Sequence, residues 1–245
     1  MTEAIFYDLK QLTGLAPSLS AQVAREIGKR IVSAKLSPGD LLEDEDTLAS
    51  QFQVSRSVIR DAVKTLVGKG LLEVRRGRGT TVRARSKWGL LDDDVLAWQQ
   101  SVPADTGLLR QLMEVRQIFE PKAARWAAER GSDESHSQIR QAIERMEMEK
   151  GAVEDFIFAD ATFHRSILRA TENEFLIALE GIIFSALLSS IRLTNNDPRT
   201  NEKSLPFHRE VYEAIASRDG SKAERVMEEL LGDTSHRLGG RLYET

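Results

Sequence analysis

The chain has 245 residues, of which 41% are hydrophobic and 29% charged, so it is long enough for one large domain or two ordinary ones. It contains no cysteine, which excludes disulfides and thiolate chemistry and fits a reducing compartment. Its first ten residues lack the pattern of a signal peptide, and no apolar run approaches the roughly 20 residues that span a bilayer. We therefore expect a cytoplasmic protein without a membrane partner.

The net charge of −4 hides a difference between the two parts of the chain. Residues 1–87 contain 15 basic and 10 acidic residues, whereas residues 88–245 contain 19 basic and 28 acidic residues. Within residues 55–85, nine residues are basic and two are acidic. A basic module joined to an acidic one predicts a polyanionic partner for the N-terminal part only.

The first 90 residues begin with an N-terminal extension, residues 1–17, that carries little pattern. A helix is expected from about residue 18 to residue 34, because apolar residues recur at helical spacing before Pro38 and Gly39. A short helix should begin at Asp44 or Asp46, and after a tight turn a longer one should run to Lys69.

The longer helix begins at Ser55, whose hydroxyl is expected to accept a backbone N–H of the first turn. Arg56 and Arg60 lie one turn apart, on a face that differs from the apolar one. Two guanidinium groups at the N-terminal end of an exposed helix suit guanine edges and phosphates. Taken alone, the same pair is more simply explained as an ordinary solvated helix face.

Two β-prone runs, residues 71–75 and 80–83, flank a glycine-containing connection and predict a hairpin. At its tip, Gly77 would let the backbone approach a phosphate, and Arg76 and Arg78 suit the negative potential of a minor groove. A basic tip can also serve only to keep a sheet edge from pairing with other chains. Its combination with the arginine helix favours a winged helix-turn-helix DNA-binding domain over residues 18–83.

Residues 84–90 form a short polar segment that we interpret as a linker. Every strong segment after it is helical, which predicts an all-α bundle of six or seven helices over residues 91–245. The expected helices are residues 92–100, 108–130, 133–150, 153–170, 174–193, 205–218 and 221–238. The fold class is therefore mainly α, with a winged helix-turn-helix before the bundle.

Two features of the helical part point to a ligand. Asp160 and His164 are four residues apart on one helix face, a spacing that suits two ligands of one metal ion. The two could also pair by a hydrogen bond in a metal-free polar pocket. Arg116 interrupts an amphipathic helix and could hold a carboxylate bidentately, or form a salt bridge with Glu120.

The stretch from Leu41 to Val82 resembles the GntR family of bacterial transcription regulators. The matching residues are Leu42, Glu45, Leu48, Ala49, Phe52, Val54, Ser55, Arg56, Arg60, Ala62, Leu66, Gly70, Leu71, Arg76, Gly77, Gly79, Thr80 and Val82. The helical remainder resembles the FadR-type C-terminal ligand-binding domain, so the likeness covers nearly the whole chain after residue 17. Residues 88–98 and 114–130 are most similar to members that repress galactonate catabolism.

The resemblance implies that the recognition helix docks in the major groove of operator DNA and that the hairpin tip enters the minor groove. The residues carried over as DNA contacts are Ser55, Arg56, Ser57, Arg60, Arg76, Gly77 and Arg78. The residue after Glu45 is an arginine and a DNA contact in the fatty-acid regulators, whereas this chain has Asp46. This departure puts a contact from the preceding helix in doubt and indicates a different operator.

The resemblance also implies that His208 joins Asp160 and His164 around a divalent metal (Zn, Ni or Mn) with a fourth histidine. That fourth position is Leu230 here, and the nearest histidine, His236, is six residues further on, so the site is incomplete. Open positions are tolerated by first-row metals.

Three residues are candidates for binding the effector itself. By the resemblance, Arg116 would face the effector carboxylate. Asn173 and Arg192 are weaker candidates for sugar hydroxyls or the acid group, and either could equally be a helix cap or a surface residue.

These observations together predict a homodimeric, ligand-responsive transcription regulator rather than an enzyme. We expect a repressor of a sugar-acid catabolic operon that a small carboxylate releases from its operator DNA. One alternative is a regulator that responds to the metal itself or to a fatty acyl group. Another is a metal-dependent hydrolase fused to a DNA-binding head, although no nucleophile elbow, phosphate loop or HExxH motif is present.

Overall fold

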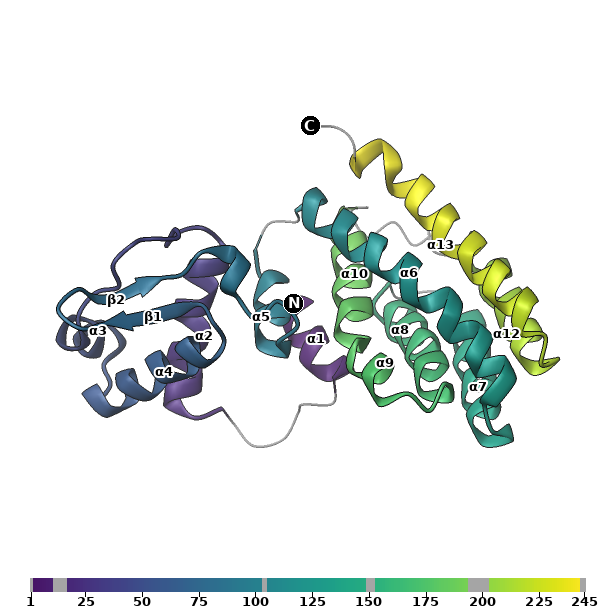
Figure 1. Ribbon diagram of the computed structural model, residues 1–245, viewed down its shortest axis with the longest axis horizontal. Coiled ribbons are helices and arrows are strands. Elements are labelled where there is room, and N and C mark those ends of the chain that lie inside the picture. Colours follow the sequence, from purple (N-terminus) through teal and green to yellow (C-terminus); the bar gives the residue numbers. More distant parts are fainter. Residues whose placement is uncertain (1, 11–16, 103–104, 149–152, 194–202, 243–245) are drawn as a thin grey trace. The chain divides into compact units, whose positions relative to one another are not determined.

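The computed structural model describes residues 2–10, 17–102, 105–148, 153–193 and 203–242. Its contacts divide the chain into two compact units, Met1–Pro103 and Ala104–Thr245. The first unit contains helices and the two-stranded sheet, and the described part of the second is helical (Figure 1). The expected fold class, a winged helix-turn-helix followed by an all-α bundle, is confirmed.

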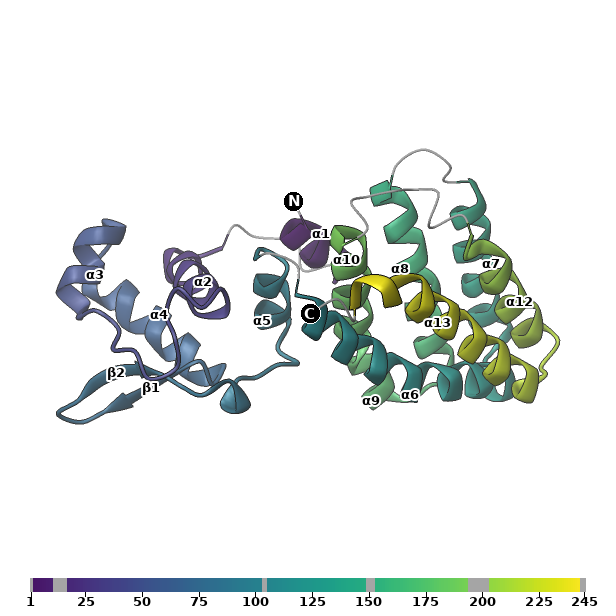
Figure 2. The ribbon, with the colours of Figure 1, turned by 90° about the horizontal axis from the view of Figure 1, so that it is seen from above.

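The N-terminal unit combines a three-helix head with a hairpin and two further helices. Its elements are α1 (Thr2–Leu9), α2 (Leu19–Val32), α3 (Glu45–Phe52), α4 (Arg56–Gly68), β1 (Leu72–Arg75), β2 (Gly79–Val82), the 3₁₀ turn η1 (Arg85–Lys87) and α5 (Asp93–Gln99). The antiparallel strands pair Leu72 with Val82, and β1 packs along α4 (Figure 2). Both α2 and α3 contact α4, which gives the expected helix-turn-helix.

Local sequence explains where the recognition helix α4 and the helix before it begin and end. The Asp44 side chain caps α3 by accepting the N–H of Thr47. At the other end of α4, Gly70 has φ +75°, and the N–H groups of Gly70 and Leu71 return to the carbonyls of Val67 and Leu66. This is the double hydrogen bond of a Schellman motif, which needs a residue with positive φ.

The first unit extends further along the chain than the sequence analysis predicts. We interpreted residues 84–90 as a linker and placed residues 91–100 in the second domain, but the unit boundary falls at Pro103. The reason is packing: Trp88 and Trp98 are buried with the apolar residues of the head in one core. Trp98 lies so close to α2 that a Cβ on Gly28 would be 2.2 Å from its ring.

The N-terminal extension is likewise part of this unit. Helix α1 buries Ile5, Phe6 and Leu9 and packs on α5. The buried carboxylate of Glu3 pairs with Arg25 and Lys29 of α2, and Tyr7 donates a hydrogen bond to Asp94 of α5.

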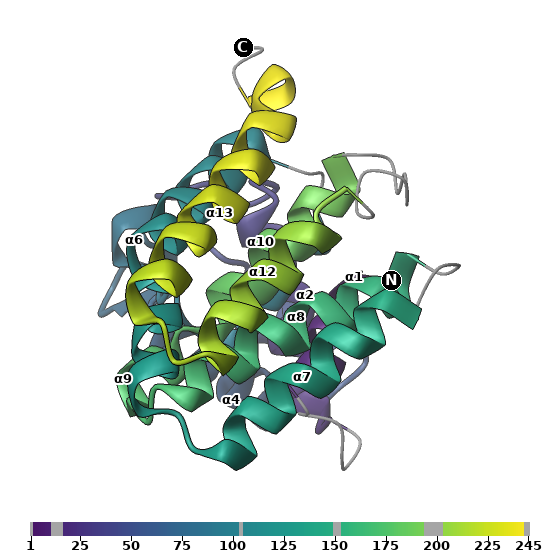
Figure 3. The ribbon, with the colours of Figure 1, turned by 90° about the vertical axis from the view of Figure 1, so that its right-hand side faces the viewer.

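The C-terminal unit is a helical bundle built around the long helix α6. Its described helices are α6 (Thr106–Arg130), α7 (Asp133–Met148), α8 (Val153–Ala170), α9 (Glu174–Ala178), α10 (Glu180–Leu193), α12 (Leu205–Ala216) and α13 (Gly220–Leu242). Helix α6 packs against α8, α10, α12 and α13, and α7 packs against α8 and α12 (Figure 3). The segment expected as one helix over 174–193 is divided at Leu179 into α9 and α10.

None of the helices in the described part of the chain is both long and apolar enough to cross a membrane.

Candidate DNA-binding face and candidate metal centre

The recognition helix α4 presents both predicted arginines to solvent, and each has a carboxylate partner from the first turn of α3. Arg56 forms an ion pair with Asp46, and Arg60 Nε donates a hydrogen bond to Glu45 Oε2 at 2.7 Å. Ser55 precedes the helix as expected, but its hydroxyl makes no capping hydrogen bond. The Ser55 hydroxyl lies 2.9 Å from the hydroxyl of Ser57 instead. Both side chains are exposed at the start of the helix.

The hairpin tip has the geometry that its glycine predicts. Gly77 adopts φ +76°, and the N–H of Arg78 donates to the carbonyl of Arg75 at 3.0 Å to close the turn. The side chains of Arg76 and Arg78 are exposed. All seven residues proposed from the sequence as DNA contacts are thus exposed, on the start of α4 and on the hairpin tip.

The second candidate site lies inside the C-terminal bundle, where three possible metal ligands converge from two helices. Asp160 and His164 come from successive turns of α8, and His208 comes from α12. Asp160 Oδ1 lies 3.2 Å from His164 Nε2 and 3.1 Å from His208 Nε2. The ligand atoms of all three residues lie within 4.8 Å of one another, and both histidines are buried.

Each imidazole ring has a partner at Nδ1, and its Nε2 lies next to Asp160. His208 Nδ1 lies 2.8 Å from the carbonyl of Ser204, and His164 Nδ1 lies 2.5 Å from Glu120 Oε2. His164 Nδ1 and Glu120 Oε2 are close enough for an ion pair, but they do not have the alignment of a regular hydrogen bond. Partners on Nδ1 orient a histidine to bind a metal through Nε2.

Arg116 is buried beside this cluster and is bound to Glu120 by an ion pair, the alternative that its sequence spacing left open. The Glu120 carboxylate therefore bridges Arg116 and His164. Arg116 Nη2 also lies 3.4 Å from His164 Nε2. From its sequence position, Glu120 was predicted only as a possible partner of Arg116, because the contact with His164 arises where α6 meets α8.

The charges in this cluster shift one another's pKa values. Burial raises the pKa of Glu120, but the positive charges of Arg116 and His164 outweigh it and lower the pKa to about 2. Burial lowers the pKa of His164, but the carboxylates of Glu120 and Asp160 raise it to about 9. For Asp160, burial is outweighed by hydrogen bonds from His164 and His208, which hold the pKa well below its usual range.

The remaining predicted positions do not complete the site. Leu230 is buried and apolar, so it supplies no ligand atom, and His236 is exposed. The Asn173 side chain caps α9 by accepting the N–H groups of Phe175 and Leu176. The side chain of Arg192 lies outside the described residues.

The donor set fits a first-row divalent metal. Two imidazole nitrogens and one carboxylate oxygen lie within 4.8 Å of one another, and such ions accept this combination with positions left open. Asp160, His164 and His208 could therefore hold a metal ion.

Comparisons with known proteins match both units. The family model described as bacterial regulatory proteins, gntR family, matches residues 19–82, and the FCD domain model matches residues 111–233. The chain is 34% identical to the galactonate operon transcriptional repressor of Escherichia coli over 86% of this chain and 93% of that protein. It is 31% identical to the HTH-type transcriptional regulator LutR of Bacillus subtilis over 87% and 98%, respectively.

A solved structure supports the fold. Lar, described as controlling the expression of the Listeria monocytogenes agr system, is similar with a TM-score of 0.65 and 21% identity, covering 93% of this chain and 99% of that chain. With both domain models matched and relatives aligned over most of its length, the chain belongs to the GntR family of transcription regulators, with a GntR DNA-binding domain and a FadR-type C-terminal domain.

Proposed function

We propose that this regulator is a homodimeric repressor of a sugar-acid catabolic operon, which a small carboxylate releases from its operator DNA in the cytoplasm. The sugar-acid class is supported by the likeness to the galactonate operon repressor. A dimer would present two recognition helices to a palindromic operator. Ser55, Arg56, Ser57 and Arg60 would then contact the major groove, and the tip residues 76–78 would contact the minor groove.

The observation that carries the proposal is the buried charge cluster. Burial of ions is costly, and apolar residues of similar volume usually stabilise a bundle as well or better. This bundle nevertheless buries the guanidinium of Arg116, the carboxylate of Glu120 and the imidazoles of His164 and His208 at one place. Such a cluster is expected where a charged ligand has to be recognised.

We propose that the effector binds where Arg116 meets the metal centre. Asp160, His164 and His208 would hold one divalent ion, Zn, Ni or Mn, which when bound offers an open position to a carboxylate or hydroxyl oxygen. Arg116 supplies a planar pair of donors for a carboxylate. Its present partner is Glu120, so an incoming carboxylate would compete with Glu120 for the Arg116 guanidinium.

We also propose that this centre binds a ligand and catalyses no reaction. Many metallohydrolases use a nearby side chain that accepts a proton from the metal-bound water. Glu120 is unsuited to that role, because its buried carboxylate is already held in an ion pair with Arg116. This property favours a sensor over the alternative of a hydrolase.

A thermal-shift screen tests the proposal. The full chain is heated with galactonate and other sugar acids, with fatty acyl compounds, and with Zn²⁺, Ni²⁺ or Mn²⁺ alone, each with and without a chelator. Because a ligand that binds the folded state raises the melting temperature, we expect a sugar acid to do so and a chelator to weaken the effect. Stabilisation by an acyl compound and not by any sugar acid would contradict the sugar-acid proposal.

A second readout separates the effector from the metal. Gel shifts with operator DNA should show release by the stabilising acid and not by the metal alone. Asp160→Asn should lose the stabilisation by metal ions, whereas Asp133→Asn, which removes an exposed carboxylate at the start of α7, should keep it. Release of DNA by metal without any acid would favour a metal-responsive regulator.

A further inference from the structure

The two arginines of the recognition helix differ from the arginines of the hairpin tip in one respect. Arg56 and Arg60 are each ion-paired with a carboxylate of α3. No carboxylate among the described residues pairs with Arg76 or Arg78. The DNA-binding face therefore carries two neutralised arginines on α4 and two unneutralised ones on the tip.

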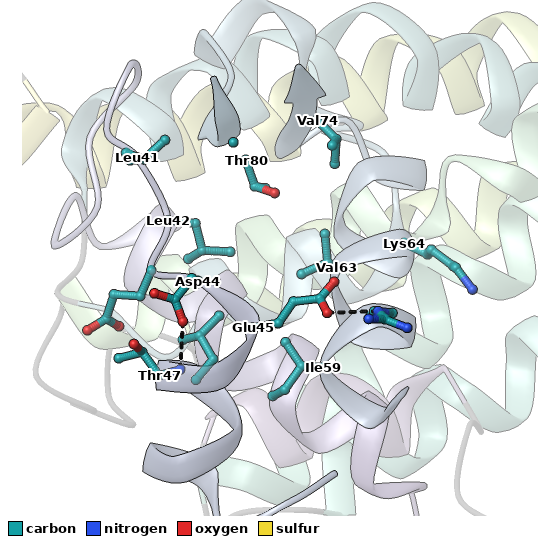
Figure 4. Close-up of a pocket in the computed structure, with 14 residues that line it drawn as sticks. Leu41, Leu42, Asp44, Glu45, Thr47, Ile59, Val63, Lys64, Val74 and Thr80 are labelled. Carbon is teal, nitrogen blue, oxygen red and sulfur yellow. Dashed lines mark hydrogen bonds and ion pairs between the residues drawn. The ribbon is translucent and has the colours of Figure 1, made fainter. Parts of the chain in front are cut away.

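The carboxylates are held in place by the start of α3. Asp44 caps this helix, so the next two residues, Glu45 and Asp46, stand in its first turn, where the helix dipole favours negative charge. Figure 4 shows Glu45 and its bond to a guanidinium in a groove lined by residues of α3, α4 and the hairpin. That guanidinium belongs to Arg60.

The atoms involved determine what each arginine can still bind. Asp46 contacts Arg56 through Nε, and Glu45 contacts Arg60 through Nε as well. An ion pair at Nε uses the inner N–H and leaves the terminal nitrogens for a second partner. Guanine offers two acceptors, O6 and N7, to such a fork, whereas a phosphate would have to bind next to the carboxylate that repels it.

The ion pair is also weak enough to respond to DNA. Arg56 and Asp46 are both 62% exposed, and exposed ion pairs contribute little to stability. A change at Asp46 should therefore alter DNA binding without unfolding the head.

We propose that Asp46 is a specificity-determining positioning residue for DNA. Its carboxylate orients Arg56 for a guanine edge and lowers the affinity of the recognition helix for phosphate. Sequence-independent DNA binding then depends on the tip arginines, Arg76 and Arg78. Helix α4 adds affinity mainly when the DNA has the base sequence that its arginines recognise.

Asp46→Asn tests this role in the full chain. One probe is a duplex pool selected from random sequence by the unaltered protein, and the other is the unselected random duplex. Because Arg56 is freed for one more phosphate, the variant should bind the random duplex about fivefold more tightly, with a slope of log affinity against log salt steeper by about 0.9. The ratio of selected to random affinity should fall about tenfold.

Asp61→Asn is the matched control. It removes one negative charge from α4 itself, where Asp61 is exposed and pairs with Lys64 instead of a recognition arginine. We expect its affinity ratio to stay within twofold of the parent. Equal effects of the two substitutions would show that only net charge matters and would overturn the proposal.

A double variant tests whether Asp46 acts through Arg56. In an Arg56→Ala background, Asp46→Asn should cause no further loss of the affinity ratio. A fresh selection with Asp46→Asn should also lose the preference for guanine at one position of each half-site. If the tenfold loss persisted without Arg56, or the selected sequences were unchanged, Asp46 would have no positioning role.

Discussion

The buried carboxylate of Glu120 offers the sharpest test of the charge cluster. Glu120→Gln keeps the shape of the side chain and removes its negative charge. Arg116 and His164 would then face each other without the anion between them, with Arg116 Nη2 only 3.4 Å from His164 Nε2. We expect the C-terminal unit to lose stability.

The magnitude follows from the pKa of Glu120 and from the behaviour of buried ion pairs. Lowering the pKa from 4.5 to about 2 corresponds to about 3 kcal/mol in favour of the charged form. Removing one partner of a buried pair typically costs about 3–5 kcal/mol, because the other charge stays buried. Both arguments predict that Glu120→Gln lowers the free energy of unfolding by roughly 3 kcal/mol or more.

The assay is urea denaturation of the metal-free protein at pH 7, followed by circular dichroism. The control is Glu144→Gln on α7, which breaks an Arg–Glu pair of the same four-residue spacing that is exposed. It should change the free energy of unfolding by less than about 0.5 kcal/mol. Adding Arg116→Met to Glu120→Gln removes the unpaired cation and should restore at least half of the loss. A loss no larger than that of the control would refute the charge account.

Two further predictions concern the N-terminal unit. Gly28→Ala should destabilise it by about 1–3 kcal/mol in the same denaturation assay, since the new Cβ would meet the buried Trp98 ring at 2.2 Å. Gly68→Ala meets nothing within 4 Å and should instead stabilise α4 by up to about 1 kcal/mol; destabilisation by both would point to a cause other than Trp98. Burial raises the pKa of Glu3, but its ion pairs with α2 lower it below 4.5, so its contribution is present above pH 4.5 and is lost as the pH falls. Glu3→Gln should therefore be less stable than the parent at pH 7, and the difference should shrink as the pH falls below 4.5; a pH-independent difference would contradict this reading.

Local signals in the sequence were enough to predict most of the fold. A capping aspartate before α3, a glycine after α4 and apolar residues at helical spacing all act within a few residues, so they can be read without the tertiary structure. The boundary between the units could not be predicted from such local signals. It depends on Trp98 packing against Gly28, some 70 residues earlier, and nothing around residues 84–90 signals that contact.

The candidate metal site was predicted in part for the same reason. The spacing of Asp160 and His164 identifies one helix face, but their contact with His208 was taken from the family resemblance. The role of Glu120 depends on the packing of α6 against α8, which no spacing within α6 reveals. Asn173, a candidate for the effector, caps the helix that begins at Glu174, which is the alternative that the sequence left open.

The central claim is that a sugar acid controls DNA binding through the buried cluster. The most direct measurement is the fluorescence anisotropy of a labelled selected duplex with the full chain and Zn²⁺, Ni²⁺ or Mn²⁺, titrated with galactonate and related sugar acids. We expect at least one acid to release the duplex from the parent, and the same acid to leave it bound to Arg116→Met. Release of the duplex from both proteins alike, or from neither by any acid, would contradict the claim.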